Sequence, residues 1–233
     1  MKRTIILGVI LLLSACTYAQ TSLRMYNKGT KLASKEDYKQ AEQCFTKAIE
    51  LNEFFTEAYF NRGLARSKQQ NYADAIADYS KAINLRPHFA KAYNNRGADR
   101  LEIGDVAGAR EDYFAAILID TNYARAHFNL GVLYIITGEL TASLLSLTKA
   151  LGFAPAMTDA WMNRGIVKSE LKDYAGAVSD FTRVIQQDPG YANAYNYRGI
   201  ANLKLGHAEA GRRDVAKARE LGSFVLQKDS TDH

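Results

Sequence analysis

The segment YFNRG at residues 59–63 recurs every 34 residues, as YNNRG at 93–97, HFNLG at 127–131, WMNRG at 161–165 and YNYRG at 195–199. Its final glycine belongs to an evenly spaced set that consists of Gly29, Gly63, Gly97, Gly131, Gly165 and Gly199. A fixed internal period of about 20 to 50 residues is typical of solenoid proteins, in which each repeat packs on its neighbours. The spacing therefore predicts an array of six stacked repeats.

Small and aromatic residues keep the same register when the repeats are numbered from residues 22, 56, 90, 124, 158 and 192. Position 20 is alanine in four repeats, position 27 is alanine in five, and position 24 is aromatic in Phe45, Tyr79, Tyr113 and Phe181. Small residues let two helices approach closely, and rings fill the space beside them. The prolines all fall at position 32, where they end a helix; they are Pro87, Pro155 and Pro189. With this pattern the chain resembles the tetratricopeptide repeat family.

That resemblance implies an all-α fold, a right-handed superhelical solenoid of six helix-turn-helix repeats with about twelve helices. Apolar residues recur at helical spacing within each half of a repeat, as in the series Ala75, Ile76, Tyr79, Ala82 and Ile83. We expect a single domain over residues 22–225, with repeats at 22–55, 56–89, 90–123, 124–157, 158–191 and 192–225, and a polar tail at 226–233.

The N-terminal residues predict an export signal. Lys2 and Arg3 precede an apolar run from Ile5 to Leu13, which is too short for a membrane-spanning helix. The sequence LSAC at residues 13–16 resembles a bacterial lipobox, which implies that residues 1–15 are removed and that Cys16 becomes a lipid attachment site. The alternative is cleavage after Ala19. We therefore expect an exported protein that is lipid-anchored in the bacterial periplasm or outer membrane, or else soluble in the periplasm or secreted.

A row of arginines precedes the repeated glycines, at position 7. Each arginine is followed sixteen residues later by an aspartate at position 23, whereas the repeat with Leu130 at position 7 has Ser146 at position 23. This correlation favours structural ion pairs between the two helices of a repeat over an anion-binding row. The predicted pairs are Arg62 with Asp78, Arg96 with Asp112, Arg164 with Asp180, and Arg198 with Asp214.

Partner binding is expected on the first helix of each repeat, because the resemblance implies that its positions 2, 5, 6, 9, 12 and 13 line a concave groove. Position 6 is an asparagine in successive repeats, and an asparagine can both donate to and accept from the backbone of an extended peptide. The alternative is an ordinary solvated surface. Repeat four adds an apolar face. The candidate partner-binding residues are Asn61, Asn95, Asn129, Asn163, Phe60, Phe128, Val132 and Ile135.

Catalysis, cofactors and metals are not expected. The four histidines fall at unrelated repeat positions or in the tail, and there is no phosphate loop, HExxH, paired CxxC or nucleophile elbow. The net charge of +5 is too small to indicate nucleic acid binding. In the last repeat, Arg212, Arg213 and Lys217 are interpreted as a solvated cap or as a docking site for an acidic partner or anionic lipid.

The sequence therefore predicts a non-catalytic scaffold or adaptor of the bacterial cell envelope, which binds a peptide or helix of an unidentified envelope protein along the groove. Contact with the membrane would be through a lipid on Cys16. The alternative function is that of a structural envelope protein, which forms homo-oligomers through the apolar surface of repeat four.

Overall fold

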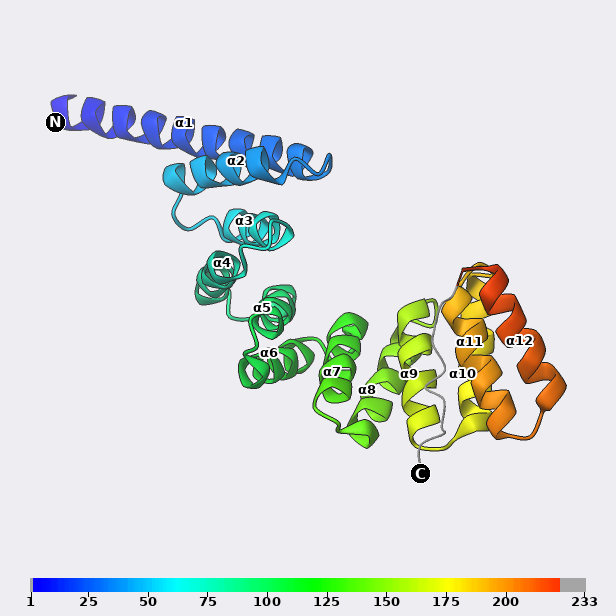
Figure 1. Ribbon diagram of the computed structural model, residues 1–233. Helices are drawn as coiled ribbons and strands as arrows, with labels where there is room; N and C mark the ends of the chain where they lie inside the picture. Colours follow the sequence, from blue (N-terminus) through cyan, green and yellow to red (C-terminus); the bar gives the residue numbers. More distant parts are fainter. Residues whose placement is uncertain (1, 223–233) are drawn as a thin grey trace. The chain divides into compact units, whose positions relative to one another are not determined.

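The computed structural model describes residues 2–222, with side chains from residue 18 onward. Over these residues every regular element is an α-helix (Figure 1). In chain order the helices are α1 (Lys2–Ala33), α2 (Tyr38–Leu51), α3 (Thr56–Lys68), α4 (Tyr72–Leu85), α5 (Ala90–Glu102), α6 (Val106–Ile119), α7 (Ala124–Ile136), α8 (Leu140–Phe153), α9 (Thr158–Glu170), α10 (Tyr174–Gln187), α11 (Ala192–Lys204) and α12 (Ala208–Glu220). The predicted tail at 226–233 lies outside the described residues.

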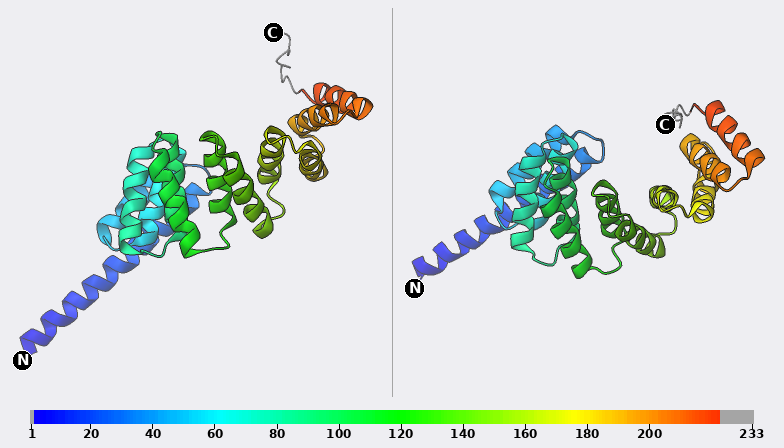
Figure 2. Two further views of the ribbon diagram at one scale, coloured as in Figure 1. Left: turned by 90° about the horizontal axis from the view of Figure 1, so that it is seen from below. Right: turned by 60° about the horizontal axis from the view of Figure 1, so that its bottom comes forward.

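The helices form two compact units, Met1–Thr121 with α1 to α6 and Asn122–His233 with α7 to α12. We call the first helix of each repeat the A helix and the second the B helix. Within a unit, each A helix packs on the B helix of its own repeat, and successive A helices touch, as α3 does with α1 and α5, and α9 with α7 and α11 (Figures 1 and 2). The predicted all-α repeat solenoid is confirmed. The 34-residue period runs unchanged through residue 121, so it gave no sign of the division into units.

The repeated glycines lie where the two helices of a repeat come closest. A Cβ atom added to Gly63 would stand 2.7 Å from Cε1 of Tyr79, and one added to Gly165 would stand 2.6 Å from Cε1 of Phe181. The aromatic residues at position 24 are at most 1% exposed. Glycine at position 8 therefore makes room for a ring that fills the core of its repeat.

The turn between the two helices of a repeat uses one left-handed residue, at position 15. Glycine occupies it with positive φ at Gly104, Gly138 and Gly206, but Glu36, Gln70 and Lys172 adopt φ of 62°, 63° and 65°. The B helices α2, α6 and α10 then begin with an aspartate whose carboxylate accepts a backbone N–H of the first turn, as Asp105 does from Gly108 at 2.9 Å. These local features fix the angle at which the chain reverses.

Candidate functional site

Each arginine at position 7 forms a two-pronged ion pair with the aspartate at position 23 of its own repeat. In the pair of Arg62 with Asp78, Nη2 lies 2.7 Å from Oδ1 and Nε lies 2.9 Å from Oδ2. The same geometry joins Arg96 to Asp112, Arg164 to Asp180, and Arg198 to Asp214, with all N–O distances between 2.7 and 2.9 Å. The four aspartates are 1–8% exposed. These arginines are therefore engaged in structural contacts and do not form a free anion-binding row.

The same arginines also connect consecutive repeats. Nη1 of Arg96 donates to the Ser80 hydroxyl at 2.9 Å, and Nη1 of Arg198 donates to the Thr182 hydroxyl at 3.2 Å, in both cases on the preceding B helix. Sequence reasoning missed this contact, although a signal was present. Position 25 is a hydroxyl residue in each repeat that precedes an arginine, namely Thr46, Ser80, Thr148 and Thr182, and it is Phe114 in the repeat that precedes Leu130.

A second donor reaches each of these aspartates from position 11 of the A helix. Arg66, Arg100 and Lys168 each place a nitrogen 3.0 Å from Oδ2 of the aspartate in their repeat. In the last repeat the shorter Asn202 replaces the basic side chain, and its Nδ2 lies 3.3 Å from Asp214 Oδ2. The cationic side chain that occupies this place in three other repeats is thus absent from the last one.

Position 5 of the A helix does not face a groove throughout, which corrects the expectation for that position. Asn94, Met162 and Asn196 are only 2–7% exposed, because this position turns into the packing between repeats. Phe60 is half-buried, with its ring centroid 5.8 Å from that of Tyr79 and 4.8 Å from that of Phe89. Phe60 therefore contributes to the core as well as to the surface.

The remaining candidate partner-binding residues lie at half-buried positions of their A helices. Asn61 on α3 donates from Nδ2 to the Tyr26 hydroxyl at 2.8 Å, and Asn95 on α5 lies 3.5 Å from the amide nitrogen of its neighbour Asn94. The others are on α7 and α9, and they are Asn129, Asn163, Phe128, Val132 and Ile135. On α7 the guanidinium of Arg125 lies 5.6 Å from the centre of the Phe128 ring.

An apolar cavity of about 280 Å³ opens among α1, α2 and α3. Its walls are mostly apolar or aromatic and include Tyr38, Phe45 and Leu64, while Asn61 and Lys68 supply polar atoms. The structure thus places one predicted binding residue, Asn61, beside a hollow of apolar side chains. The sequence pattern identified the amide but not the cavity, because Tyr38 and Phe45 come from the B helix α2.

One buried carboxyl group has no counterpart in the other repeats. Asp99 on α5 is 4% exposed, and its Oδ1 accepts a hydrogen bond from the Ser67 hydroxyl at 2.7 Å. Within the described chain, neither its Oδ2 nor the buried hydroxyl of Tyr79 has a hydrogen-bond partner. Burial raises the pKa of Asp99 from 3.8 to about 6.

Other kinds of site are not seen in the described part of the chain. Over residues 18–222, where side chains are described, no group of histidine, cysteine, aspartate or glutamate side chains is arranged to hold a metal ion. Within that same range, 18–222, no helical stretch is both long and apolar enough to span a bilayer. Cys44 is a buried free thiol, and the predicted lipid attachment site Cys16 lies outside the side chains that the structure describes.

Family models for the tetratricopeptide repeat match residues 24–55, 56–89, 94–158 and 162–224. The chain belongs to the tetratricopeptide repeat family. Tetratricopeptide repeat proteins generally mediate protein–protein interactions and are not enzymes, which agrees with the predicted class of function. None of the curated proteins with which the chain was compared matches it.

Several solved structures of tetratricopeptide repeat proteins are similar to this chain. YrrB, described as a protein with an unusual peptide-binding site, is 25% identical with a TM-score of 0.67, and the match covers 76% of this chain and 92% of that one. PilF of Pseudomonas aeruginosa is 16% identical with a TM-score of 0.79, covering 89% and 95%. A repeat protein from Parabacteroides merdae is 19% identical with a TM-score of 0.70, covering 88% and 81%. The last two likenesses concern the fold alone.

Proposed function

We propose that this tetratricopeptide repeat protein is a non-catalytic scaffold or adaptor that binds an extended segment of a partner protein along its A helices. The observation that carries the proposal is the apolar cavity among α1, α2 and α3, with the Asn61 amide at its edge. Apolar hollows with a few polar groups are the usual form of a binding site. The peptide-binding site described for YrrB gives a precedent within the family.

The chemistry of the cavity favours one apolar side chain of the partner, held beside its backbone. Tyr38, Phe45 and Leu64 would contact the side chain. The hydrogen bond from Asn61 Nδ2 to Tyr26 orients the amide, and its oxygen is then placed to accept a peptide N–H. Lys68 is exposed at the end of α3, where its charge would favour a partner with an acidic residue nearby.

Peptide display on the purified protein tests this proposal. Selected peptides are expected to share an apolar residue and to bind Leu64→Asp at least about tenfold more weakly than the wild type, because the change places a charge in the apolar hollow. The matched control is Ala73→Asp, which adds the same charge at an exposed position of α4. Equal loss of binding in both variants, or no loss in Leu64→Asp, would refute a site in this cavity.

The alternative function is self-association, in which a second copy of the chain binds the apolar surface of repeat four. It is favoured by the apolar side chains of Ile136 on the A helix α7 and Leu145 on the B helix α8, each 60% exposed. Light scattering on the purified protein separates the two functions. A stable dimer that Phe128→Ala disrupts supports self-association. A monomer contradicts self-association and supports binding of a different protein along the A helices.

The proposal places this protein in the bacterial cell envelope, with a lipid on Cys16 as its anchor. Lys2 and Arg3, the apolar run and the lipobox-like sequence at 13–16 support this location. Cells fed labelled palmitate are expected to label the wild type but not Cys16→Ser. A mature protein that begins at Gln20 would instead show cleavage after Ala19 and a soluble exported form.

A further inference from the structure

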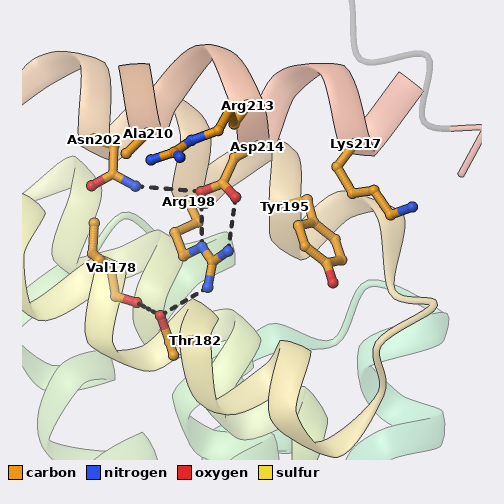
Figure 3. Close-up of a pocket in the computed structure, with 9 residues that line it drawn as sticks. All are labelled: Val178, Thr182, Tyr195, Arg198, Asn202, Ala210, Arg213, Asp214 and Lys217. Atoms are coloured by element: carbon orange, nitrogen blue, oxygen red, sulfur yellow. Dashed lines mark hydrogen bonds and ion pairs between the residues drawn. The ribbon is translucent and has the colours of Figure 1, made fainter. Parts of the chain in front are cut away.

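An open cleft of about 580 Å³ lies among α10, α11 and α12 in the second unit (Figure 3). It is lined by Val178, Thr182, Tyr195, Arg198, Asn202, Ala210, Arg213, Asp214 and Lys217. This cleft is built largely on two B helices, so it is distinct from the A-helix cavity considered above. The inference drawn from it does not depend on the proposed A-helix site.

The cleft differs from the equivalent place in other repeats because of Asn202. In the repeats that carry Arg66, Arg100 and Lys168 at position 11, a long basic side chain extends to the aspartate and supplies a second positive charge there. Asn202 reaches Asp214 with a neutral amide at 3.3 Å and leaves the space beyond it open. In the last repeat, the place beside the aspartate that a basic side chain of position 11 occupies in those three repeats is therefore open.

The floor of the cleft is polar but already paired. Arg198 binds both carboxylate oxygens of Asp214, at 2.7 and 2.8 Å, and also donates to the Thr182 hydroxyl, as the dashed lines in Figure 3 show. The Thr182 hydroxyl in turn donates to the Val178 carbonyl at 2.7 Å. Because Asp214 is neutralised by Arg198, it does not set the charge that a ligand meets at the mouth of the cleft.

The mouth of the cleft carries two further positive charges, one turn apart on α12. Arg213 is exposed, and no carboxylate in the described chain lies within ion-pair distance of its guanidinium. Lys217 pairs with Glu220 at 3.0 Å, but both side chains are exposed, and such a pair is weak enough to exchange for another anion. With Arg198 and Asp214 cancelling, the lining keeps an excess of positive charge.

We propose that this cleft binds an acidic side chain of a partner protein, with Arg213, whose side chain extends toward Asn202 and Ala210, as the ligand of the carboxylate (Figure 3). Lys217 extends in the opposite direction and adds positive charge at the mouth without sharing that carboxylate. A guanidinium offers two parallel donors that match a carboxylate. The ring of Tyr195 and the side chains of Val178 and Ala210 provide apolar surface for the methylene groups of a glutamate. A free phosphate would use the cations but not this apolar surface.

The test is fluorescence anisotropy at low ionic strength, with a labelled glutamate-rich peptide and the same peptide carrying glutamine in place of each glutamate. Arg213→Gln is expected to weaken binding of the acidic peptide about tenfold. The matched control is Arg212→Gln, which removes the same charge from the neighbouring exposed residue that does not line the cleft and is expected to change binding by less than about twofold.

A second variant tests the shape of the cleft instead of its charge. Asn202→Arg restores the residue that repeats two and three carry at position 11, so it should fill the cleft, bond to Asp214 and abolish peptide binding although it adds a positive charge. Circular dichroism is expected to show the same helix content in all variants.

Four results would overturn the proposal. The first three are equal weakening by Arg212→Gln and Arg213→Gln, equal binding of the glutamine peptide, and undiminished binding by folded Asn202→Arg. Displacement of the acidic peptide from the wild type by inorganic phosphate at lower concentrations than by free glutamate would assign the cleft to phosphate groups and would also refute an acidic side chain as its ligand.

Discussion

Asp99 offers a direct test of how burial acts on a charge within this array. Its pKa is raised from 3.8 to about 6 because the carboxyl group is buried on α5. A raised carboxyl pKa means that the folded state holds its proton more tightly than the unfolded state. The contribution of Asp99 to stability is therefore fully present below about pH 4 and is lost as the pH rises through about 6.

The magnitude follows from the size of the shift. A change from 3.8 to about 6 corresponds to about 3 kcal/mol at pH values above both, at about 1.4 kcal/mol per unit. Asp99→Asn keeps an oxygen that can accept from Ser67 but carries no charge. We expect this variant to be more stable than the wild type by about 3 kcal/mol at pH 7.5. At pH 4, where the Asp99 carboxyl group of the wild type is mostly protonated, the two proteins should have nearly the same free energy of unfolding.

Urea unfolding followed by circular dichroism, at pH 4, 6 and 7.5, measures the difference between the two proteins. Other carboxylates titrate in both, so the difference isolates Asp99. If the difference in unfolding free energy stays constant across these pH values, the carboxyl is not buried as described and the reasoning fails. Chemical shifts of the Asp99 side chain across the same range provide an independent titration curve.

Three further predictions concern packing, pairing and turns, and thermal unfolding checks each. Gly97→Ala should destabilise the protein by about 1–3 kcal/mol, because the added Cβ would stand 2.9 Å from the ring of Tyr113; an unchanged melting temperature would contradict this. Asp180→Ala should cost about 3–5 kcal/mol by leaving the largely buried side chains of Arg164 and Lys168 without their carboxylate, and adding Arg164→Leu should recover part of the loss; no recovery would argue against a stranded charge. Lys172→Gly should stabilise by about 0.5–1 kcal/mol, since Lys172 has φ of 65°, whereas destabilisation would show that its side chain matters more than its backbone.

The sequence was sufficient to predict contacts within a repeat. The spacing of 34 residues, the ring opposite four of the six repeated glycines and the pairing seen in Arg62 with Asp78 all recur in a fixed register, so one geometry explains the copies that share these residues. Contacts between repeats were harder to predict, because they depend on how one helix pair is rotated against the next. The bond from Arg96 to Ser80 and the burial of Asn94 both belong to this class.

The cavity among α1, α2 and α3 and the cleft among α10, α11 and α12 could not be predicted from the sequence, for a related reason. A cavity depends on which side chain is missing as much as on which is present. Asn202 is an ordinary polar residue in the sequence, and only the structure shows that Arg66 fills the corresponding place in its own repeat. Tyr38 and Phe45 likewise line a cavity only because residues of α3 form its other wall.

The arginine contacts also bear on how such a chain can change its length. Arg96 takes its carboxylate from its own repeat and its hydroxyl from the preceding one, while Ser80 serves the arginine that follows. If the gene segment for residues 56–89 were duplicated in place, the new Arg62 would meet a Ser80 hydroxyl behind it, and the new Ser80 would face Arg96 ahead. The arginine at each new junction would thus find both its carboxylate and its hydroxyl at once. Because each repeat carries an arginine for the preceding repeat and a hydroxyl for the following one, tandem duplication keeps this contact without a compensating mutation.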